Sequence, residues 1–382
     1  MRTHDLDDHR PRREVERIDT VVIGGGQAGL AAGYHLARRD RSFVIVDACR
    51  HTGDSWRCHW DSLRLYSPAR LDGLPGMDFP ASGSSYPTKD EVADFLEAYT
   101  KTFNLPVRTG TRVSRLAKSG DGYVVECNRT LFEARNVIVA TGTFGRVPRV
   151  PASSARIDPR VVQLHSSEYR NLDQLQSGPV LVVGASHSGG DIALEAARTH
   201  PTILCGRDTG QLPVRLEAGY MRLLFPLMWQ FWGHALSVRT PMGRKMRAKA
   251  RFHGAPMIRV KGVDLDAAGV ERVTERVTAA RDGSPVVGAY GPVDVANIIW
   301  CTGFRHDFSW IDAPVIGDDG WPRESHGVVS ESPGLYFTGL AFQSSFRSML
   351  IGGVGADAEH VVRHIATHRE PGDLGSPTHQ PQ

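Results

Sequence analysis

A run of glycines near the start of the chain has the spacing of a phosphate-binding turn. It follows an apolar segment predicted as a strand and precedes a helix predicted for 28–38. In this setting Gly24 permits a tight turn, Gly26 lets the backbone approach a pyrophosphate, and Gly29 lets helix and strand pack closely. The helix N-terminus adds N–H groups and a positive dipole end. We therefore interpret the run as a dinucleotide site rather than a Gly-rich hairpin; it reads Gly24-Gly25-Gly26-Gln27-Ala28-Gly29.

An acidic residue stands at the end of the next predicted strand. Asp47 follows the apolar run 43–46 and lies 23 residues after Gly24. A carboxylate at this position can accept hydrogen bonds from ribose hydroxyls, and it repels a 2′-phosphate. The sequence therefore predicts that the first unit binds FAD or NAD and not NADP.

A second predicted strand, glycine turn and helix repeat this pattern later in the chain. The middle glycine is replaced by Ser186, whose hydroxyl can hydrogen-bond a phosphate oxygen but leaves less room. Counting 23 residues from Gly184 leads to Arg207, which could pair with a 2′-phosphate and so select NADPH, or could be an ordinary solvated charge. The second turn reads Gly184-Ala185-Ser186-His187-Ser188-Gly189.

Two such units in one chain predict an α/β fold with two dinucleotide-binding, Rossmann-like domains and two cofactors, FAD in the first and NADPH in the second. Between the units we expect a capped helix from Thr88 to about Phe103 and three strands. After Cys301 we expect one more strand and a final helix from about 348 to 365. The three middle strands are predicted at 112–116, 123–127 and 136–140, and the later one at 335–338.

This order of elements predicts that one domain is interrupted by the other. The expected segments are a loose N-terminal arm, an FAD domain in two pieces, an NADPH domain that contains an apolar insert at 211–257, and a loose tail. Their predicted bounds are 1–17 for the arm, 18–155 and 295–370 for the FAD domain, 156–294 for the NADPH domain and 371–382 for the tail.

Composition excludes several other classes of protein. The 45 Lys and Arg and 42 Asp and Glu leave a net charge of +3 on 382 residues, of which 41% are hydrophobic and 23% charged. Disordered chains and nucleic-acid binders have a larger net charge, and fibrous chains show repeats. The 5 Cys are scattered, and no apolar leader is present, so we expect a reduced, cytoplasmic, soluble chain without a transmembrane segment.

The insert carries an apolar stretch followed by a basic one. The apolar stretch covers residues 223–238 and is interrupted by Pro226, Gln230 and His234. Six Lys and Arg follow between 239 and 251. Such a segment could be a helical lid over the substrate channel, a dimer contact, or a surface that touches a membrane peripherally through 220–251. The sequence leaves these alternatives open, as it does the choice between monomer and homodimer.

Taken together, these features resemble the class B flavoprotein monooxygenases. The resemblance is nearest to the flavin-containing monooxygenases, including the plant indole-3-pyruvate monooxygenases of the YUCCA type and their bacterial relatives, and it runs from about Asp19 to Ile365. The motifs that carry it, besides the two glycine turns and Asp47, are Gly53-Asp54-Ser55-Trp56, Ala140-Thr141-Gly142, Pro148, Pro151, His165-Ser166-Ser167-Glu168-Tyr169-Arg170 and Cys301-Thr302-Gly303-Phe304.

The resemblance implies an enzyme that acts on a small molecule and O2. NADPH would reduce FAD, and the reduced flavin would form a C4a-hydroperoxide that oxygenates the substrate. Implied FAD contacts are Gly24, Gly26, Gln27, Ala28, Gly29, Asp47, Ser55, Trp56, Val113, Ala140, Thr141, Gly142 and Ile351. Implied NADPH contacts are Gly184, Ser186, His187, Ser188, Gly189, Arg207, Thr302 and Gly303. Candidate catalytic residues are Trp56, Ser67 and Arg347.

The chain also departs from the family pattern. The fingerprint around His165 and Tyr169 has Pro159 and Val161 where Phe and Gly are usual, and Tyr169 itself argues against a Baeyer–Villiger enzyme. Many members have an Asn that steadies the hydroperoxide, whereas this chain reads Leu65-Tyr66-Ser67-Pro68.

Three functions therefore remain open: a monooxygenase, an NADPH oxidase that releases hydrogen peroxide, and a non-catalytic nucleotide-binding redox sensor. A disulfide reductase is disfavoured because Cys49 and Cys58 have eight intervening residues, unlike a redox pair. No Cys/His cluster has metal spacing, and no basic stripe with aromatics indicates nucleic acid.

Overall fold

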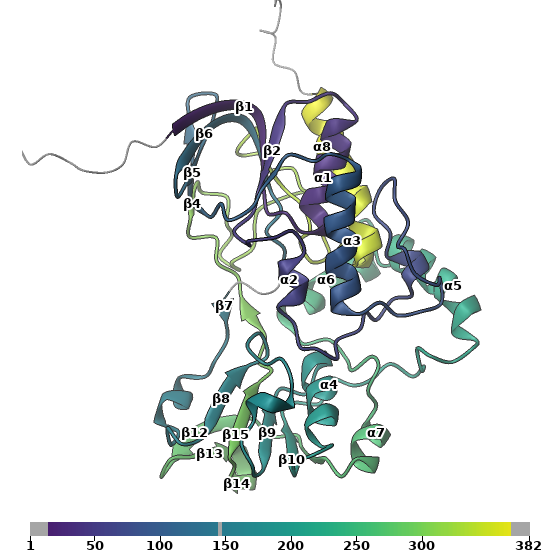
Figure 1. Ribbon diagram of the computed structural model, residues 1–382, viewed down its shortest axis with the longest axis vertical. Coiled ribbons are helices and arrows are strands. Elements are labelled where there is room, and N and C mark those ends of the chain that lie inside the picture. Colours follow the sequence, from purple (N-terminus) through teal and green to yellow (C-terminus); the bar gives the residue numbers. More distant parts are fainter. Residues whose placement is uncertain (1–13, 144–146, 368–382) are drawn as a thin grey trace, which may run out of the picture.

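The computed structural model describes residues 14–143 and 147–367, and these form two main sheets with separate cores and two smaller ones (Figure 1). The larger sheet has eight strands in the order β17-β4-β5-β6-β1-β2-β3, with β18 also on β6. The pairs β1–β2, β1–β6 and β18–β6 are parallel, so strands from both ends of the chain meet on β6. The bounds are β1 Glu14–Ile23, β2 Phe43–Val46, β3 Val107–Arg108, β4 Val113–Ser119, β5 Gly122–Cys127, β6 Thr130–Val139, β17 Ile311–Asp312 and β18 Leu335–Phe337.

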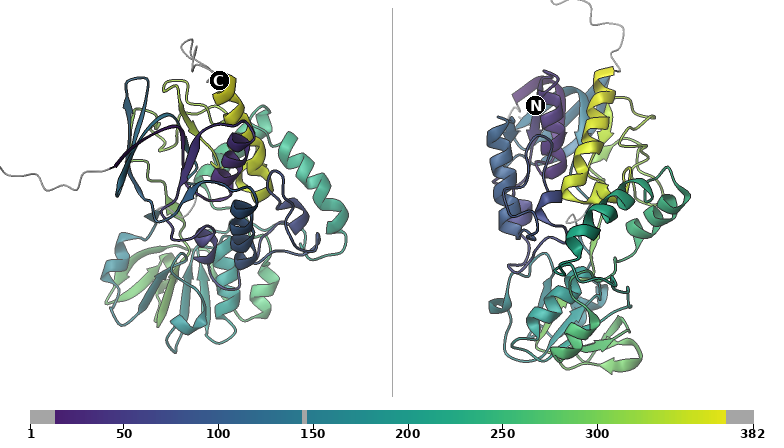
Figure 2. Two further views of the ribbon diagram at one scale, coloured as in Figure 1. Left: turned by 45° about the horizontal axis from the view of Figure 1, so that its top comes forward. Right: turned by 90° about the vertical axis from the view of Figure 1, so that its right-hand side faces the viewer.

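Three helices lie side by side against this sheet, as Figures 1 and 2 show for α1 (Gln27–Ala37), α3 (Lys89–Thr102) and α8 (Val354–Thr367). The predicted cap of α3 is confirmed, because the Thr88 hydroxyl accepts from the Glu91 N–H at 3.2 Å and the Glu91 carboxylate accepts from the Thr88 N–H at 2.7 Å. The short α2 (Asp54–Arg57) packs against α3.

The smaller sheet has five parallel strands in the order β11-β10-β9-β15-β8. Its central strand residues 180–183 are all buried, as expected of a parallel strand covered on both faces. Helix α4 and a small three-stranded antiparallel sheet contribute to the two cores. The bounds are β8 Val162–His165, β9 Val180–Val183, β10 Thr202–Cys205, β11 Glu271–Val273, β15 Asn297–Trp300, α4 His187–Ala196, α7 Gly262–Ala267, β12 Val277–Arg281, β13 Ser284–Val287 and β14 Gly291–Pro292.

The chain passes between the two sheets twice, and the two passages pair with each other. Strand β7 (Val147–Pro148) and strand β16 (Phe304–Arg305) are antiparallel neighbours. They are the narrow connection visible between the upper and lower parts of Figure 1.

The expected fold class, α/β with two Rossmann-like units, is confirmed, although the larger sheet is mixed because β4–β5 and β5–β6 are antiparallel. The expectation of a loose arm up to residue 17 is wrong for residues 14–17, because Glu14 to Arg17 pair with Thr130 to Glu133 of β6. The Arg17–Glu133 ion pair at 2.7 Å helps to hold this polar end in the sheet. The expectations for 1–13 and for the tail 371–382 lie outside the described residues.

The final helix begins later than predicted. Two 3-10 turns, at 346–349 and 351–353, precede α8, which begins at Val354 rather than near 348. Leu350 between them is extended, with φ −104° and ψ 151°. A Cβ on Gly352 would lie 1.9 Å from the carbonyl oxygen of Leu71, so this turn fits closely against the neighbouring chain. The remaining 3-10 turns are Ala69–Leu71, Ala152–Arg156, Leu172–Gln174 and Gly288–Tyr290.

The insert forms two helices, α5 (Met221–His234) and α6 (Pro241–Phe252). Thr240 caps α6 by accepting from the Gly243 N–H at 2.9 Å, and Pro241 occupies the first helical position. In Figure 1, α5 lies at the right-hand edge and α6 lies behind α2 and α3, at the height of the junction of the two sheets.

Candidate cofactor and active site

The first glycine turn has close backbone contacts on one side and open space on the other. Gly24 has φ +112°, and a Cβ there would lie 2.6 Å from the carbonyl oxygen of Ala140. A Cβ on Gly29 would lie 1.9 Å from the oxygen of Gly24, whereas one on Gly26 would meet nothing within 4 Å. Gly24 and Gly29 therefore serve the fold, and Gly26 leaves room for a ligand at the α1 N-terminus.

Asp47 is fixed beside this turn. Its carboxylate accepts hydrogen bonds from the N–H of Gly25 at 2.5 Å and from the N–H of Cys49 at 2.6 Å. Each ionised oxygen retains acceptor capacity beyond one such bond. The site therefore presents an oriented negative group at the end of β2.

The predicted second flavin loop also reaches the first turn. Gly53 has φ +88°, and a Cβ there would lie 2.6 Å from the Ala93 oxygen, so only glycine brings α2 this close to α3. Trp56 then donates from Nε1 to the side-chain oxygen of Gln27 at 3.3 Å. Ser55, by contrast, is exposed.

Four other predicted flavin contacts lie at different places around this turn. Thr141 and Gly142, which has φ +73°, directly follow Ala140, whose backbone lies against Gly24. Ile351 is buried in the same apolar cluster as Ala28 and Ala140. Val113 begins β4, two residues after Thr111, whose N–H donates to the Asp47 carbonyl oxygen at 2.7 Å.

The second glycine turn repeats the first geometry. A Cβ on Gly184, which has φ +116°, would lie 2.3 Å from the Cys301 oxygen, and one on Gly189 would lie 1.7 Å from the Gly184 oxygen. The Ser186 hydroxyl, however, donates to the carbonyl oxygen of Ala255 at 2.6 Å. The side chain expected to contact phosphate is thus bonded to the segment after α6.

The other predicted nicotinamide contacts surround the carboxyl end of the smaller sheet. Arg207 is exposed just after β10. Ser188, in the first turn of α4, is half-buried. Thr302 donates its hydroxyl to the Arg149 carbonyl, and Gly303 accepts from the Arg149 N–H at 2.9 Å. Thr302 and Gly303 therefore hold the two passages together.

Sequence reasoning missed a polar stripe on α4 that meets the loop before α3. His187, Asp191 and Glu195 recur every four residues and so share one helix face. Tyr66 donates to Asp191 at 2.7 Å, and Ser62 donates to Glu195. The spacing of four along a buried helix was the signal that could have identified this stripe.

Burial makes the stripe electrostatically unusual. It raises the pKa of Asp191 to about 6 and lowers the pKa of His187 to about 4. The pKa of Tyr66 is raised well above its ordinary value, first by burial and then by the Asp191 charge. The rings of Tyr66 and His187 lie 5.1 Å apart, so a neutral imidazole and a neutral phenol lie side by side at the N-terminus of α4.

Two candidate catalytic side chains make contacts within the protein. The Ser67 hydroxyl is buried and donates to the Asp72 carboxylate at 2.6 Å. The Arg347 guanidinium lies over the Trp229 ring of α5, 5.5 Å from its centroid. Burial lowers the pKa of Arg347. Ser67 is thus placed in a structural hydrogen bond, and Arg347 contacts the insert.

The fingerprint residues stabilise the junction. The His165 ring contacts the Gly303 oxygen at 3.0 Å through Nε2 and the Ser167 hydroxyl at 2.8 Å through Nδ1. Burial lowers its pKa. Tyr169 is fully buried and donates to Glu195 at 2.9 Å. Both side chains are therefore occupied in holding the passages and α4.

The cysteines near the flavin loop do not have the character of a redox pair. Cys49 and Cys58 are not joined to each other, and burial together with the Asp47 charge raises the pKa of Cys49 to about 12. A thiol of that pKa is a poor nucleophile at neutral pH.

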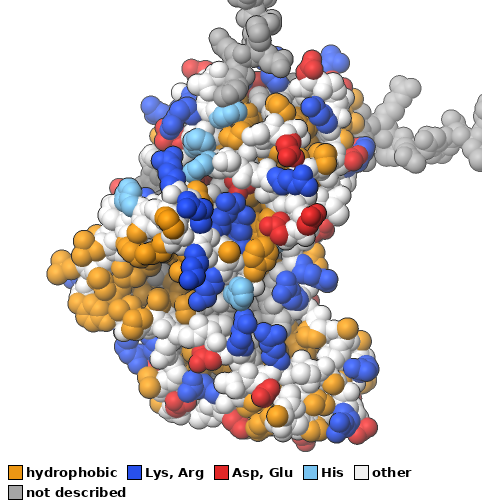
Figure 3. Space-filling model, turned by 180° about the vertical axis from the view of Figure 1, so that it is seen from behind, with side chains coloured by type: hydrophobic (Ala, Val, Ile, Leu, Met, Phe, Trp, Pro, Cys, Tyr) orange, Lys and Arg blue, Asp and Glu red, His pale blue; other side chains and the backbone are white. Residues whose placement is uncertain are grey.

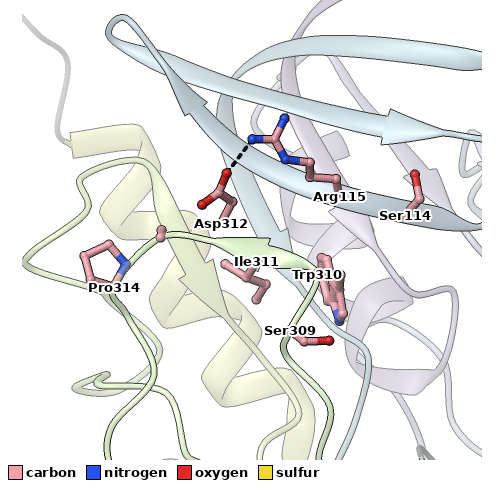
Figure 4. Close-up of a pocket in the computed structure, with 8 residues that line it drawn as sticks. Ser114, Arg115, Ser309, Trp310, Ile311, Asp312 and Pro314 are labelled. Atoms are coloured by element: carbon pink, nitrogen blue, oxygen red, sulfur yellow. Dashed lines mark hydrogen bonds and ion pairs between the residues drawn. The ribbon is translucent and has the colours of Figure 1, made fainter.

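A surface hollow lies elsewhere on the larger sheet. It has a volume of about 590 Å³ between β4 and β17, and the Arg115–Asp312 ion pair crosses its rim (Figure 4). Among the residues that line it are Ser114, Trp310 and Pro314, and none is a predicted site residue. The hollow is therefore separate from the glycine turns.

Known proteins share this arrangement. A family model described as pyridine nucleotide-disulphide oxidoreductase matches residues 21–212. An uncharacterized CzcO-like oxidoreductase of Geobacillus kaustophilus is 36% identical over 92% of this chain and 99% of its own. The indole-3-pyruvate monooxygenase YUCCA4 of rice (Oryza sativa subsp. japonica) is 26% identical over 93% of this chain and 90% of its own. A variant flavin monooxygenase from Stenotrophomonas maltophilia superposes with a TM-score of 0.72 at 28% identity, covering 92% and 98%.

These matches bear out the resemblance drawn from the motifs, and they make the chain an enzyme, which sets the sensor hypothesis aside. The paired glycine turns and the likeness along nearly the whole chain lead to one assignment. The chain belongs to the pyridine nucleotide-disulphide oxidoreductase family, as a flavin-dependent oxidoreductase related to the CzcO-like proteins and the flavin monooxygenases.

Proposed function

We propose that this enzyme is an FAD- and NADPH-dependent monooxygenase that oxygenates a small, apolar or aromatic molecule. One observation carries the proposal: the two glycine turns share a backbone geometry but are followed by opposite charges, Asp47 after β2 and Arg207 after β10. A carboxylate suits an unphosphorylated ribose, and an arginine suits a 2′-phosphate. The similar proteins named as monooxygenases support the reaction class.

We assign FAD to the segments 18–155 and 295–370. The open space at Gly26 and the N–H groups at the start of α1 fit a pyrophosphate, and the oriented Asp47 carboxylate fits a ribose. Trp56, held by Gln27, would border the ring system. The turn at Ile351 leads into α8, whose positive N-terminal end would stabilise negative charge on a reduced flavin.

We assign NADPH to 156–294. Because the Ser186 hydroxyl is bonded to Ala255, phosphate contacts in this unit would come from the backbone N–H groups of the α4 N-terminus and from Arg207. The neutral His187 beside this turn adds no repulsive charge to the nicotinamide half.

The walls next to the two sites favour an apolar substrate. Tyr66 and Tyr86, before α3, pack with Leu71, Phe225 and Trp232 in one apolar cluster beneath α5. Aromatic walls bind apolar and aromatic molecules through area burial and ring contacts. This cluster adjoins Tyr66 and therefore the polar stripe of α4.

Bound FAD and NADPH would supply the hydride transfer and the activation of O2, so the protein itself would need no nucleophile. The chain's residues bind and orient the two cofactors, and the α5 cluster excludes water. The Tyr66 hydroxyl holds its proton toward Asp191. Its position between the two units suits it to orient groups at their interface.

An NADPH oxidase is the second candidate, and Tyr66 is the observation that favours it. The family resemblance implies an Asn in many members where this chain reads Leu65-Tyr66-Ser67-Pro68, and here the Tyr66 hydroxyl donates to Asp191. Less stabilisation of activated oxygen would release hydrogen peroxide.

The decisive experiment measures whether electrons from NADPH end in an oxygenated product or in hydrogen peroxide. The purified holoenzyme is supplied with NADPH, O2 and a panel of small indoles, sulfides and amines, and oxygenated product and hydrogen peroxide are counted against NADPH consumed. Product close to one per NADPH with any member supports the monooxygenase. Hydrogen peroxide at one per NADPH with every member supports the oxidase, and no NADPH consumption overturns both.

A further inference from the structure

Helix α5 is apolar on both of its faces. Its inner residues Met221 and Phe225 are buried in the cluster described above. Its outer residues Leu223, Leu227 and Phe231 are 80%, 68% and 48% exposed and recur every four positions, so they form one stripe. Figure 3 shows hydrophobic side chains gathered on the flank where Figure 1 places α5. A surface helix ordinarily presents a polar outer face, whereas this stripe is left uncovered by the residues that the structure describes.

Helix α6, which follows α5 along the chain, exposes both apolar and basic side chains. Met242 and Phe252 are more than half exposed. Arg244, Lys245 and Lys249 are exposed between them. The two other arginines of the helix turn inward to Glu324 and do not contribute to this face.

The charge of the whole segment has one sign. Between Glu217 and Asp264 the chain has nine Lys and Arg and no Asp or Glu. This is exceptional in a chain whose total charge is only +3. An apolar helix beside a cluster of exposed cations is complementary to a surface that is apolar inside and anionic at its rim.

We propose that α5 and α6 form an interfacial membrane-binding surface for anionic lipid. The stripe of Leu223, Leu227 and Phe231 enters the boundary between headgroups and acyl chains, and Arg244, Lys245 and Lys249 contact the headgroup phosphates. Among the described residues no helix has both the length and the hydropathy to cross a bilayer, so the contact is parallel to the surface.

Charge also favours an anionic bilayer over a second copy of the chain as the partner of this surface. A symmetric dimer through α5 and α6 would bring the same cations of two copies together, and like charges at an interface oppose association. An anionic bilayer has no such penalty. It also buries the stripe without requiring a complementary protein surface.

The test is co-sedimentation of the full-length holoenzyme with large unilamellar vesicles at low and physiological salt. We expect binding to vesicles of phosphatidylcholine with phosphatidylglycerol to exceed binding to pure phosphatidylcholine by at least ten-fold, and to weaken as salt rises. Equal or absent binding to both kinds of vesicle overturns the proposal.

Paired variants distinguish vesicle binding through this surface from non-specific vesicle binding. The double variant Leu223→Glu with Leu227→Glu is expected to lose at least ten-fold in vesicle binding. The matched control is Val15→Glu with Val263→Glu, which changes two exposed valines outside the insert, 55% and 62% exposed, and keeps binding. Thermal unfolding checks that each variant is folded.

A charge variant and a mass measurement complete the test. Arg244→Gln with Lys245→Gln and Lys249→Gln should lose the preference for phosphatidylglycerol while leaving weak binding to neutral vesicles. Light scattering without lipid reports the oligomeric state. A dimer that Leu223→Glu with Leu227→Glu dissolves, together with vesicle binding that the same variant leaves intact, would identify the stripe as a protein interface and overturn the proposal.

Discussion

Single side chains decide which charges and hydrogen bonds each unit can offer a ligand. Asp47 and Arg207 occupy equivalent positions after the second strand of each unit, yet only Asp47 is fixed by backbone N–H groups. Arg207 is exposed, so its guanidinium is available to a ligand phosphate. Burial also raises the pKa of two acids, Asp72 and Asp191.

Replacing Arg207 tests coenzyme choice. We expect Arg207→Ala to reduce the ratio of kcat/KM for NADPH over that for NADH by about ten-fold or more, because a charge-assisted fork to the 2′-phosphate is lost. Steady-state kinetics with both coenzymes measure the ratio. Arg281→Ala, an exposed arginine on β12, is the control, and an unchanged ratio in Arg207→Ala would show that this strand end does not read the phosphate.

Replacing Asp72 tests how a buried acid changes the pH dependence of stability. Burial raises its pKa to about 7, although the Ser67 hydroxyl donates to it. The folded state therefore holds a proton that the unfolded state releases near pH 4, and stability falls as pH rises from about 4 to about 7. Asp72→Asn should stabilise the protein at pH 8 by on the order of 2 kcal/mol relative to its effect at pH 5.

Denaturant unfolding at the two pH values measures this difference. Asp312→Asn, in an exposed ion pair, is the control and should shift the pH dependence little. If Asp72→Asn and the control have the same pH dependence, Asp72 is ionised in the folded state.

At the scale of elements, each glycine turn fixes a helix against a strand through contacts that no other residue allows. In both turns a Cβ added to the last glycine would lie less than 2 Å from the carbonyl oxygen of the first glycine. The helix N-terminus is thereby brought to the edge of the sheet where ligands bind in open α/β sheets.

Gly189→Ala tests the second turn alone. Its Cβ would lie 1.7 Å from the Gly184 oxygen, so α4 must shift away from β9. We expect kcat/KM for NADPH to fall by about 100-fold while bound flavin is retained, because the first turn is unchanged. Flavin absorbance and stopped-flow reduction measure the two effects.

Gly219→Ala is the matched control, since an added Cβ there meets nothing within 4 Å. Loss of flavin from Gly189→Ala at the same level as loss of reduction would contradict separate roles for the two turns.

Local pattern was enough to predict the elements that carry their own signals. The turns at 24–29 and 184–189, the strands beside them and the cap of α3 were all recognisable because each depends on neighbours in sequence. The strand at 14–17 was missed because its stability comes from pairing with β6, more than a hundred residues away. The Tyr66–Asp191 hydrogen bond was missed for the same reason, since it joins two units.

Across the whole molecule, the insert is tied to the rest by a buried ion-pair group. The Glu324 side chain is fully buried and accepts from Arg247 at 2.9 Å and from Arg251 at 3.2 Å. Burial lowers the pKa of Arg251 to about 10, and its guanidinium lies 4.3 Å from the Trp321 ring centroid. The position of α6, and with it the face proposed to meet lipid, depends on this group.

Glu324→Gln should loosen that attachment. The change leaves Arg251 buried without its counter-charge, and we expect a loss of about 3 kcal/mol in unfolding free energy with faster amide exchange in α6. Glu331→Gln, which removes an exposed pair with Arg323, should cost under about 1 kcal/mol. Equal losses in the two variants would show that the buried group does not anchor α6.

The pairing of β7 with β16 gives the smaller sheet a modular character. Because Arg149 and Gly303 are hydrogen-bonded neighbours, the segment between them leaves and re-enters the larger unit at one place. Recombination between related genes could exchange this segment as a unit without changing the order of strands in either main sheet. Coenzyme preference and the α5 part of the substrate wall could then be inherited separately from the flavin site, and a chimaera joined at these two residues would combine the coenzyme preference of one parent with the flavin site of the other.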